Sequence, residues 1–190
     1  MKNNIRKVSL ILIFAISLTL LIAACGRPQP VNESMKTSST TVNSVDSPTE
    51  KGLLGAAAAN QDKNLEIADM LRYALEDEYL ARDTYTKIMA KFGEIRPFVN
   101  IRESENNHIA MLLPLFETYG LSLPEHESDQ APYGSTLQEA YIAGVQAEIE
   151  NIAMYERFLK EDLPEDVRNI FEKLLRASEK HLKAFERKAD

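Results

Sequence analysis

Apolar residues recur at three- and four-residue steps through the C-terminal two thirds of the chain, which is the spacing of amphipathic helices. Glycine and proline divide this region into four such segments, at about residues 63–92, 97–119, 137–159 and 165–185. A capping box of Thr136 and Glu139 precedes the third segment, and Pro114 within the second should kink that helix. Because no segment alternates with the two-residue period of a strand, the pattern predicts an all-α protein.

The links between these segments constrain how the helices are arranged. Residues 93–96 and 162–164 are short links, so each should join two antiparallel neighbours. Residues 120–135 can extend over roughly 50 Å, whereas a helix over 97–119 is roughly 35 Å long. We therefore expect an antiparallel four-helix bundle with a long crossover between the second and third helices.

The first 25 residues have the organisation of an export signal. Lys2, Arg6 and Lys7 precede an apolar run over residues 8–24, which ends in Ile-Ala-Ala-Cys at Cys25. These last four residues resemble a bacterial lipobox, in which the cysteine is lipidated. The sequence predicts that residues 1–24 are a lipoprotein signal peptide and that Cys25 anchors the exported chain to a membrane. An uncleaved N-terminal anchor helix is the alternative.

The next stretch has a different composition, because serine, threonine and proline dominate and bulky apolar residues are few. Such a stretch cannot bury enough surface to offset the entropy lost on ordering. We interpret residues 25–61 as a flexible tether, in which residues 52–59 are a lead-in or the first turns of a helix. The folded domain is then expected over residues 62–190.

Charge and cysteine content exclude several classes of function. The chain has 29 acidic and 22 basic residues, so no nucleic-acid partner is expected. Its single cysteine permits no intramolecular disulfide and no CxxC redox or zinc motif.

Five metal-capable side chains interrupt the apolar stripes of the four predicted helices. They are Glu78 in the first, Glu105 and His108 in the second, Glu148 in the third and His181 in the fourth. An isolated carboxylate in an apolar core costs several kcal/mol, and a bound cation compensates for it. Three carboxylates and two imidazoles suit iron or manganese.

Each of these residues also has a structural interpretation when it is taken alone. A Glu-x-x-His pair is common on solvated helices, and a lone core histidine is usually hydrogen-bonded within the core. The coincidence of five such residues near the middle of four inward stripes favours a metal site. Other acids fall off the stripes and are expected on a solvated face: Glu76, Asp77, Glu103, Glu156 and Glu172.

Four segments carry a resemblance to a known family. They are ALEDEYLARDTY at 74–85, IRESENNH at 101–108, AGVQAEIENI at 143–152 and RASEKHLKAF at 176–185. Together they resemble the DUF2202 branch of the ferritin-like superfamily, and the first also resembles a rubrerythrin helix. The resemblance implies a ferritin-like bundle with a carboxylate-bridged di-iron centre. Glu78 and His108 would then hold one metal, Glu148 and His181 the other, and Glu105 would bridge the two.

One position departs from the family pattern. Ferritin-like di-iron sites usually carry a second Glu-x-x-His on the last helix, but here Ser178 lies three residues before His181. Glu150 or Asn151 are candidates to fill the gap. A single metal ion, a dinuclear site with extra water, and a metal other than iron therefore stay open.

The leading hypothesis for function is oxidation of ferrous iron or removal of peroxide. Tyr85 and Tyr155 share faces with the expected ligands and should contact their carboxylates, or act as one-electron relays. The electron donor must be another molecule, since the chain lacks the four cysteines of a rubredoxin-type site. The alternatives are a metal-binding or storage module without turnover, and a structural helical interaction domain. A homodimer is also compatible with the sequence.

Overall fold

The computed structural model describes residues 53–126 and 133–190, and the regular elements in these ranges are all helices. They are α1 (Gly55–Ala59), α2 (Ile67–Phe92), α3 (Phe98–Thr118), α4 (Leu137–Phe158) and α5 (Glu165–Ala189). The all-α prediction is confirmed. The predicted signal peptide, Cys25 and most of the predicted tether lie outside the described residues. Within the described ranges, no helix is both long enough and apolar enough to cross a membrane.

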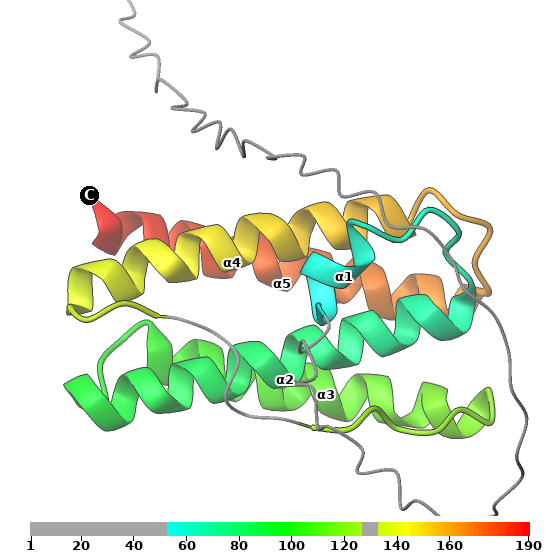
Figure 1. Cartoon of the computed structure of the whole chain (residues 1–190), viewed down its shortest axis with the longest axis horizontal. Coiled ribbons are helices and arrows are strands. Elements are labelled where there is room, and N and C mark those ends of the chain that lie inside the picture. The colour runs from blue at the N-terminus through cyan, green and yellow to red at the C-terminus, as the bar shows by residue number, and fades with distance from the viewer. Residues whose placement is uncertain (1–52, 127–132) are drawn as a thin grey trace, which may run out of the picture. The chain divides into compact units, whose positions relative to one another are not determined.

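The four long helices lie side by side, and α1 lies across α2 and α4 (Figure 1). Helices α2 and α3 pack as an antiparallel pair, as do α4 and α5, and α3 ends at the opposite end from the start of α4. The described start of the link between α3 and α4 runs back over α2, where His126 Nε2 lies 2.8 Å from Asp83 Oδ2. The described start of the link therefore lies against α2.

Helix boundaries follow local sequence signals. Thr136 accepts a hydrogen bond from the Glu139 N–H while the Glu139 side chain accepts from the Thr136 N–H, so the predicted capping box is confirmed. Helix α2 ends at Gly93, which has a φ of +95°. Helix α3 continues past Pro114 to Thr118, although Pro114 has no N–H to donate to the preceding turn.

The buried apolar side chains form two clusters, one toward each end of the helices. One cluster includes Leu71, Leu112 and Phe171, and the other includes Phe98 and Phe185. On each long helix, buried polar residues separate the members of one cluster from those of the other. A polar layer therefore crosses the core.

Close packing of α4 on α5 depends on a residue without a side chain. Gly144 is buried, and a Cβ at this position would lie 2.9 Å from the ring of Phe185. Any larger residue would push this ring away from the polar layer or separate the two helices.

The short helix α1 is held at both ends by side chains of the long helices. Glu76 Oε2 accepts a hydrogen bond from the Gly55 N–H at 3.1 Å, and Asp77 Oδ1 accepts one from the Ala56 N–H at 2.8 Å. Arg157 on α4 donates to the carbonyl oxygens of Ala59 and Asp62. These contacts satisfy backbone groups that a helix end leaves unpaired.

One expectation is corrected by the contacts of α1. Glu76 and Asp77 were expected on a solvated face, but Glu76 is only 7% exposed and both side chains anchor α1. Residues 52–59 were interpreted as a lead-in or the first turns of a helix, and within them Ala56 and Ala59 belong to the apolar core. Local periodicity could not identify α1 as the partner of these side chains, since the contacts join residues 21 positions apart.

The anchoring of α1 predicts different effects for two glycine substitutions. Gly55 and Gly120 have φ values of +54° and +63°, so Gly→Ala strains both backbones similarly. Only at Gly55 would the new Cβ clash, at 2.4 Å from Asp77 Oδ1. We expect Gly55→Ala to lower the free energy of unfolding by about 1 kcal/mol or more beyond the loss in Gly120→Ala, measured by urea denaturation. Equal losses in the two variants would contradict this account of α1.

Candidate metal centre

All five sequence-predicted metal-capable residues lie together in the polar layer. Glu78 comes from α2, Glu105 and His108 from α3, Glu148 from α4 and His181 from α5, and none is more than 8% exposed. They converge because each follows the helical spacing of the apolar residues on its own helix. Four helices thus each bring ionisable groups to one level of the core.

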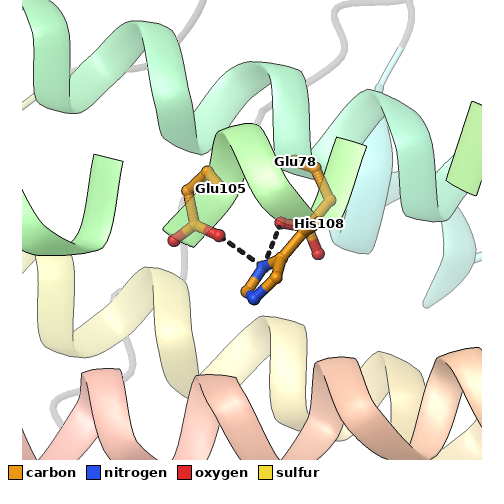
Figure 2. Close-up of side chains that lie close together, drawn as sticks. All are labelled: Glu78, Glu105 and His108. Atoms are coloured by element: carbon orange, nitrogen blue, oxygen red, sulfur yellow. Dashed lines mark hydrogen bonds and ion pairs between the residues drawn. The ribbon is translucent and has the colours of Figure 1, made fainter. Parts of the chain in front are cut away.

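Glu105 lies at the centre of this group. Its Oε2 is 2.7 Å from His108 Nδ1, and the same nitrogen is 3.0 Å from Glu78 Oε2 (Figure 2). Its other oxygen, Oε1, is 3.2 Å from His181 Nδ1, which is itself 3.6 Å from Glu148 Oε1. The two oxygens of Glu105 therefore face two different imidazoles, whose ring centroids are 5.6 Å apart.

The ligand atoms fall into two groups that could each hold a metal ion. One group is Glu78, Glu105 and His108, and the other is Glu105, Glu148 and His181. Within each group the ligand atoms lie within 4.8 Å of one another. Glu105 belongs to both groups.

Two buried tyrosines connect the two halves of the centre. Tyr85 on α2 donates a hydrogen bond of 2.9 Å to Glu148 on α4, and Tyr155 on α4 donates one of 2.7 Å to Glu78 on α2. Burial raises the pKa of both phenols well above the usual value, and nearby carboxylates add to the rise. The tyrosines are therefore neutral donors that orient the two carboxylates.

A serine fixes the orientation of one imidazole. Ser104 Oγ lies 3.0 Å from His108 Nε2, the ring nitrogen that points away from the carboxylates. If Nε2 carries its proton and donates to Ser104, Nδ1 is free to bind a metal. Sequence reasoning missed Ser104, although its position four residues before His108 puts both on one helix face.

The supplementary ligand candidates form a hydrogen-bonded chain of their own. Ser178 donates to Asn151 Oδ1 at 2.6 Å, and Asn151 Nδ2 donates to Asp77 Oδ2 at 2.5 Å. Glu150 is half-buried and accepts a hydrogen bond from Gln146, so it does not join the five residues. Ser178 stands where the family pattern has a glutamate. It begins a series of hydrogen bonds that runs through Asn151 to Asp77 and α1.

Sequence reasoning placed Asp77 on a solvated face, and it lies instead beside the centre. Burial raises its pKa to about 6, although the hydrogen bonds from Ala56 and Asn151 act in the opposite direction. A signal was available, because Asp77 lies three residues after Ala74 and four before Ala81, both on the inward side of α2.

The carboxylates of the centre differ in proton affinity. Burial raises the pKa of Glu78 to about 8 and that of Glu148 to about 7, and the charge of Glu105 adds to both. Burial acts on Glu105 as well, but hydrogen bonds and positive charge from His108 and His181 outweigh it and lower the pKa to about 2. Glu105 is therefore the carboxylate that stays ionised.

The two imidazoles hold protons in the absence of metal. Burial opposes their charge, but Glu78 and Glu105 raise the pKa of His108 to about 10, and Glu105 and Glu148 raise that of His181 to about 9. The geometry still leaves one group unsatisfied, since the buried Nδ1 of His181 has no well-aligned hydrogen bond. Buried carboxylate oxygens and imidazole nitrogens that converge in this way could hold a metal ion.

Comparisons with known proteins agree with the helical architecture. The chain is 27% identical over 128 residues to the uncharacterized protein MJ0754 of Methanocaldococcus jannaschii. The match covers 59% of this chain and 69% of that protein. The crystal structure of hypothetical protein MJ0754 from Methanococcus jannaschii matches with a TM-score of 0.60 and 26% identity, over 68% of this chain and 82% of that one.

A second crystal structure shares the fold alone. The conserved hypothetical protein rv2844 from Mycobacterium tuberculosis matches with a TM-score of 0.56 and 15% identity, over 65% of this chain and 98% of that one. The family described as "Uncharacterized protein domain (DUF2202)" matches residues 67–190, which contain all five residues of the candidate metal centre. The chain therefore belongs to the DUF2202 family.

Proposed function

We propose that this protein is a ferritin-like metal-binding protein that holds two iron ions and reacts with O2 or peroxide. Glu78 and His108 would hold one ion, Glu148 and His181 would hold the other, and Glu105 would serve both. The observation that carries the proposal is the position of Glu105, which belongs to both ligand groups and directs one oxygen toward each imidazole. Two ferrous ions supply the two electrons that reduce O2 to peroxide or peroxide to water.

The surrounding residues support this chemistry in three ways. Tyr85 and Tyr155 hold Glu148 and Glu78 by hydrogen bonds, so both carboxylates are oriented before a metal binds. Ser104 orients His108. Burial between two apolar clusters keeps bulk water from the centre. Return of the oxidised ions to the ferrous state would need an external electron donor, because the sequence lacks the four cysteines of a rubredoxin-type site.

The proposal includes a location at a membrane. The lipobox-like sequence before Cys25 supports lipidation, export and attachment to the outer face of the cell membrane or to a periplasm-facing membrane. The Ser/Thr/Pro-rich residues that follow support a tether between this anchor and the helical domain. A homodimer is compatible with this arrangement.

The alternative is a centre without turnover, as in a metal-storage module or a purely structural domain. The observation that favours it is that the five ionisable side chains pair with one another in the absence of metal. Metal content tests the structural alternative, and reactivity tests the storage alternative.

The first prediction concerns how much metal the protein retains. After anaerobic loading with ferrous iron and removal of excess, the full chain should retain about two ions, measured by elemental analysis. His108→Ala combined with His181→Ala should abolish this retention, because each ion loses its imidazole, while circular dichroism stays helical. His126→Ala is the matched control, since His126 contacts Asp83 on α2 and not the centre. Retention below about 0.2 ions per chain in the unmodified protein would refute the metal site.

Reactivity separates an oxidase from a storage module. When O2 or peroxide is added to the anaerobically loaded protein, near-ultraviolet bands of oxidised iron should appear faster than in a solution of the same free iron. Bound iron that oxidises no faster than free iron would favour the storage alternative.

The dependence of stability on pH should reverse between the metal-free and metal-bound protein. The folded-state pKa of His108 is about 10 against an ordinary 6.5, and that of Glu78 is about 8 against 4.5. Both pKa values are raised on folding. The stability that His108 and Glu78 contribute is therefore complete at pH values below their ordinary pKa, and it is lost as pH rises through 8 to 10. We expect the metal-free protein to lose roughly 1–3 kcal/mol of unfolding free energy between pH 6.5 and 8.5.

Bound metal replaces these protons, so the stabilisation it provides should increase over the same pH interval. Urea unfolding at both pH values, with chelator or with manganese, measures the two slopes. Slopes of the same sign with and without manganese would contradict the assignment of these residues as ligands.

A further inference from the structure

A cavity of about 330 Å³ lies between α2 and α4, next to α1. Its lining follows α2 from Asp77 to Ile88 and α4 from Glu150 back to Ala143, and Leu54 closes the side next to α1. This length of α2 corresponds to roughly 16 Å at 1.5 Å per residue. The volume lies within the range of pockets that hold small organic molecules.

The cavity exists because small residues face each other across the two helices. Ala81 on α2 and Ala143 and Ala147 on α4 leave space that larger side chains would fill, while the nearly inaccessible Tyr85 and Ile88 form a rigid floor. Most of the lining is apolar. It therefore favours an apolar molecule and disfavours one that carries a full charge.

The two carboxylates of the lining, Asp77 and Glu150, lie at the end of the cavity next to α1. Both oxygens of Asp77 already accept hydrogen bonds, whereas Glu150 accepts one from Gln146 and a carboxylate can accept several. These carboxylates would repel an anion and would accept a hydrogen bond from a hydroxyl group.

The same cavity adjoins the candidate metal centre. A smaller cavity of about 10 Å³ is lined by Glu78, Glu105 and Glu148, and four residues line both cavities. One of these four is Tyr85, whose hydroxyl is bonded to Glu148. A molecule in the larger cavity is therefore separated from the centre by a single layer of side chains.

We propose that this cavity binds a small, uncharged and mainly apolar molecule that carries a hydroxyl donor, such as a phenol or an alcohol, and excludes carboxylic acids. Binding in this cavity does not depend on the proposed function. Metal-free protein tests binding, so failure of the metal site and failure of the cavity are distinguishable. If the protein binds phenol but no metal, the proposed metal site is refuted and the proposed binding cavity is supported.

The test compares phenol with benzoate, which share a ring and differ in charge at neutral pH. Both are titrated into the metal-free full chain and followed by ligand-observed NMR. We expect saturable binding of phenol and at least about tenfold weaker binding of benzoate. No saturable binding of phenol, or equal binding of the two, would overturn the proposal.

Cavity-filling variants locate the bound molecule. Ala143→Phe and Thr84→Phe place a ring in the cavity from opposite helices, and each should weaken phenol binding by about tenfold or more. Ala153→Phe is the matched control, because Ala153 is exposed on the same helix as Ala143 but does not line the cavity, and its binding should be unchanged. Circular dichroism checks that each variant is folded. Undiminished binding in both cavity variants would overturn the assignment.

Sedimentation of the same variants tests a different occupant. If the unmodified protein is a dimer that does not bind phenol, and Ala143→Phe makes it a monomer, then the cavity between α2 and α4 is covered by a second copy of the chain. That result would also overturn the proposal.

Discussion

Everything in this fold depends on burying five ionisable side chains at one level of the core. A single unpaired charge in that place would cost several kcal/mol, so the group persists only because its members compensate one another or a cation. Glu105 is central to that compensation, since it is the carboxylate that stays ionised and contacts both imidazoles. The division of the apolar core into two clusters follows from the same layer.

The two helical hairpins contribute to this layer in an approximately symmetric way. In each hairpin the first helix supplies a glutamate and the second a histidine, and the tyrosine seven residues after each glutamate bonds to the glutamate of the other hairpin. The symmetry breaks at one pair of positions, because Glu105 precedes His108 by three residues while Ser178 precedes His181 by three. The two sides of the centre are therefore chemically unequal, with one carboxylate serving both.

Most of the layer was predictable from sequence because it depends on local periodicity. The helix spans, the capping box at Thr136 and the inward direction of all five ionisable residues follow from spacing along one helix. Contacts between distant segments were not predictable in this way. The bonds of Tyr85 and Tyr155 join residues 63 and 77 positions apart, and the anchoring of α1 by Asp77 depends on which helices are neighbours.

The position of α1 determines how the domain responds to mechanical load. The backbone N–H groups of Gly55 and Ala56 bond to Glu76 and Asp77, which lie two residues and one residue before Glu78. A pull on α1 is therefore transmitted to α2 at the level of the polar layer, through the hydrogen bonds of Gly55 and Ala56. Loss of these two hydrogen bonds would remove one partner each from Glu76 and Asp77, and Asp77 is linked through Asn151 to Ser178 beside the centre.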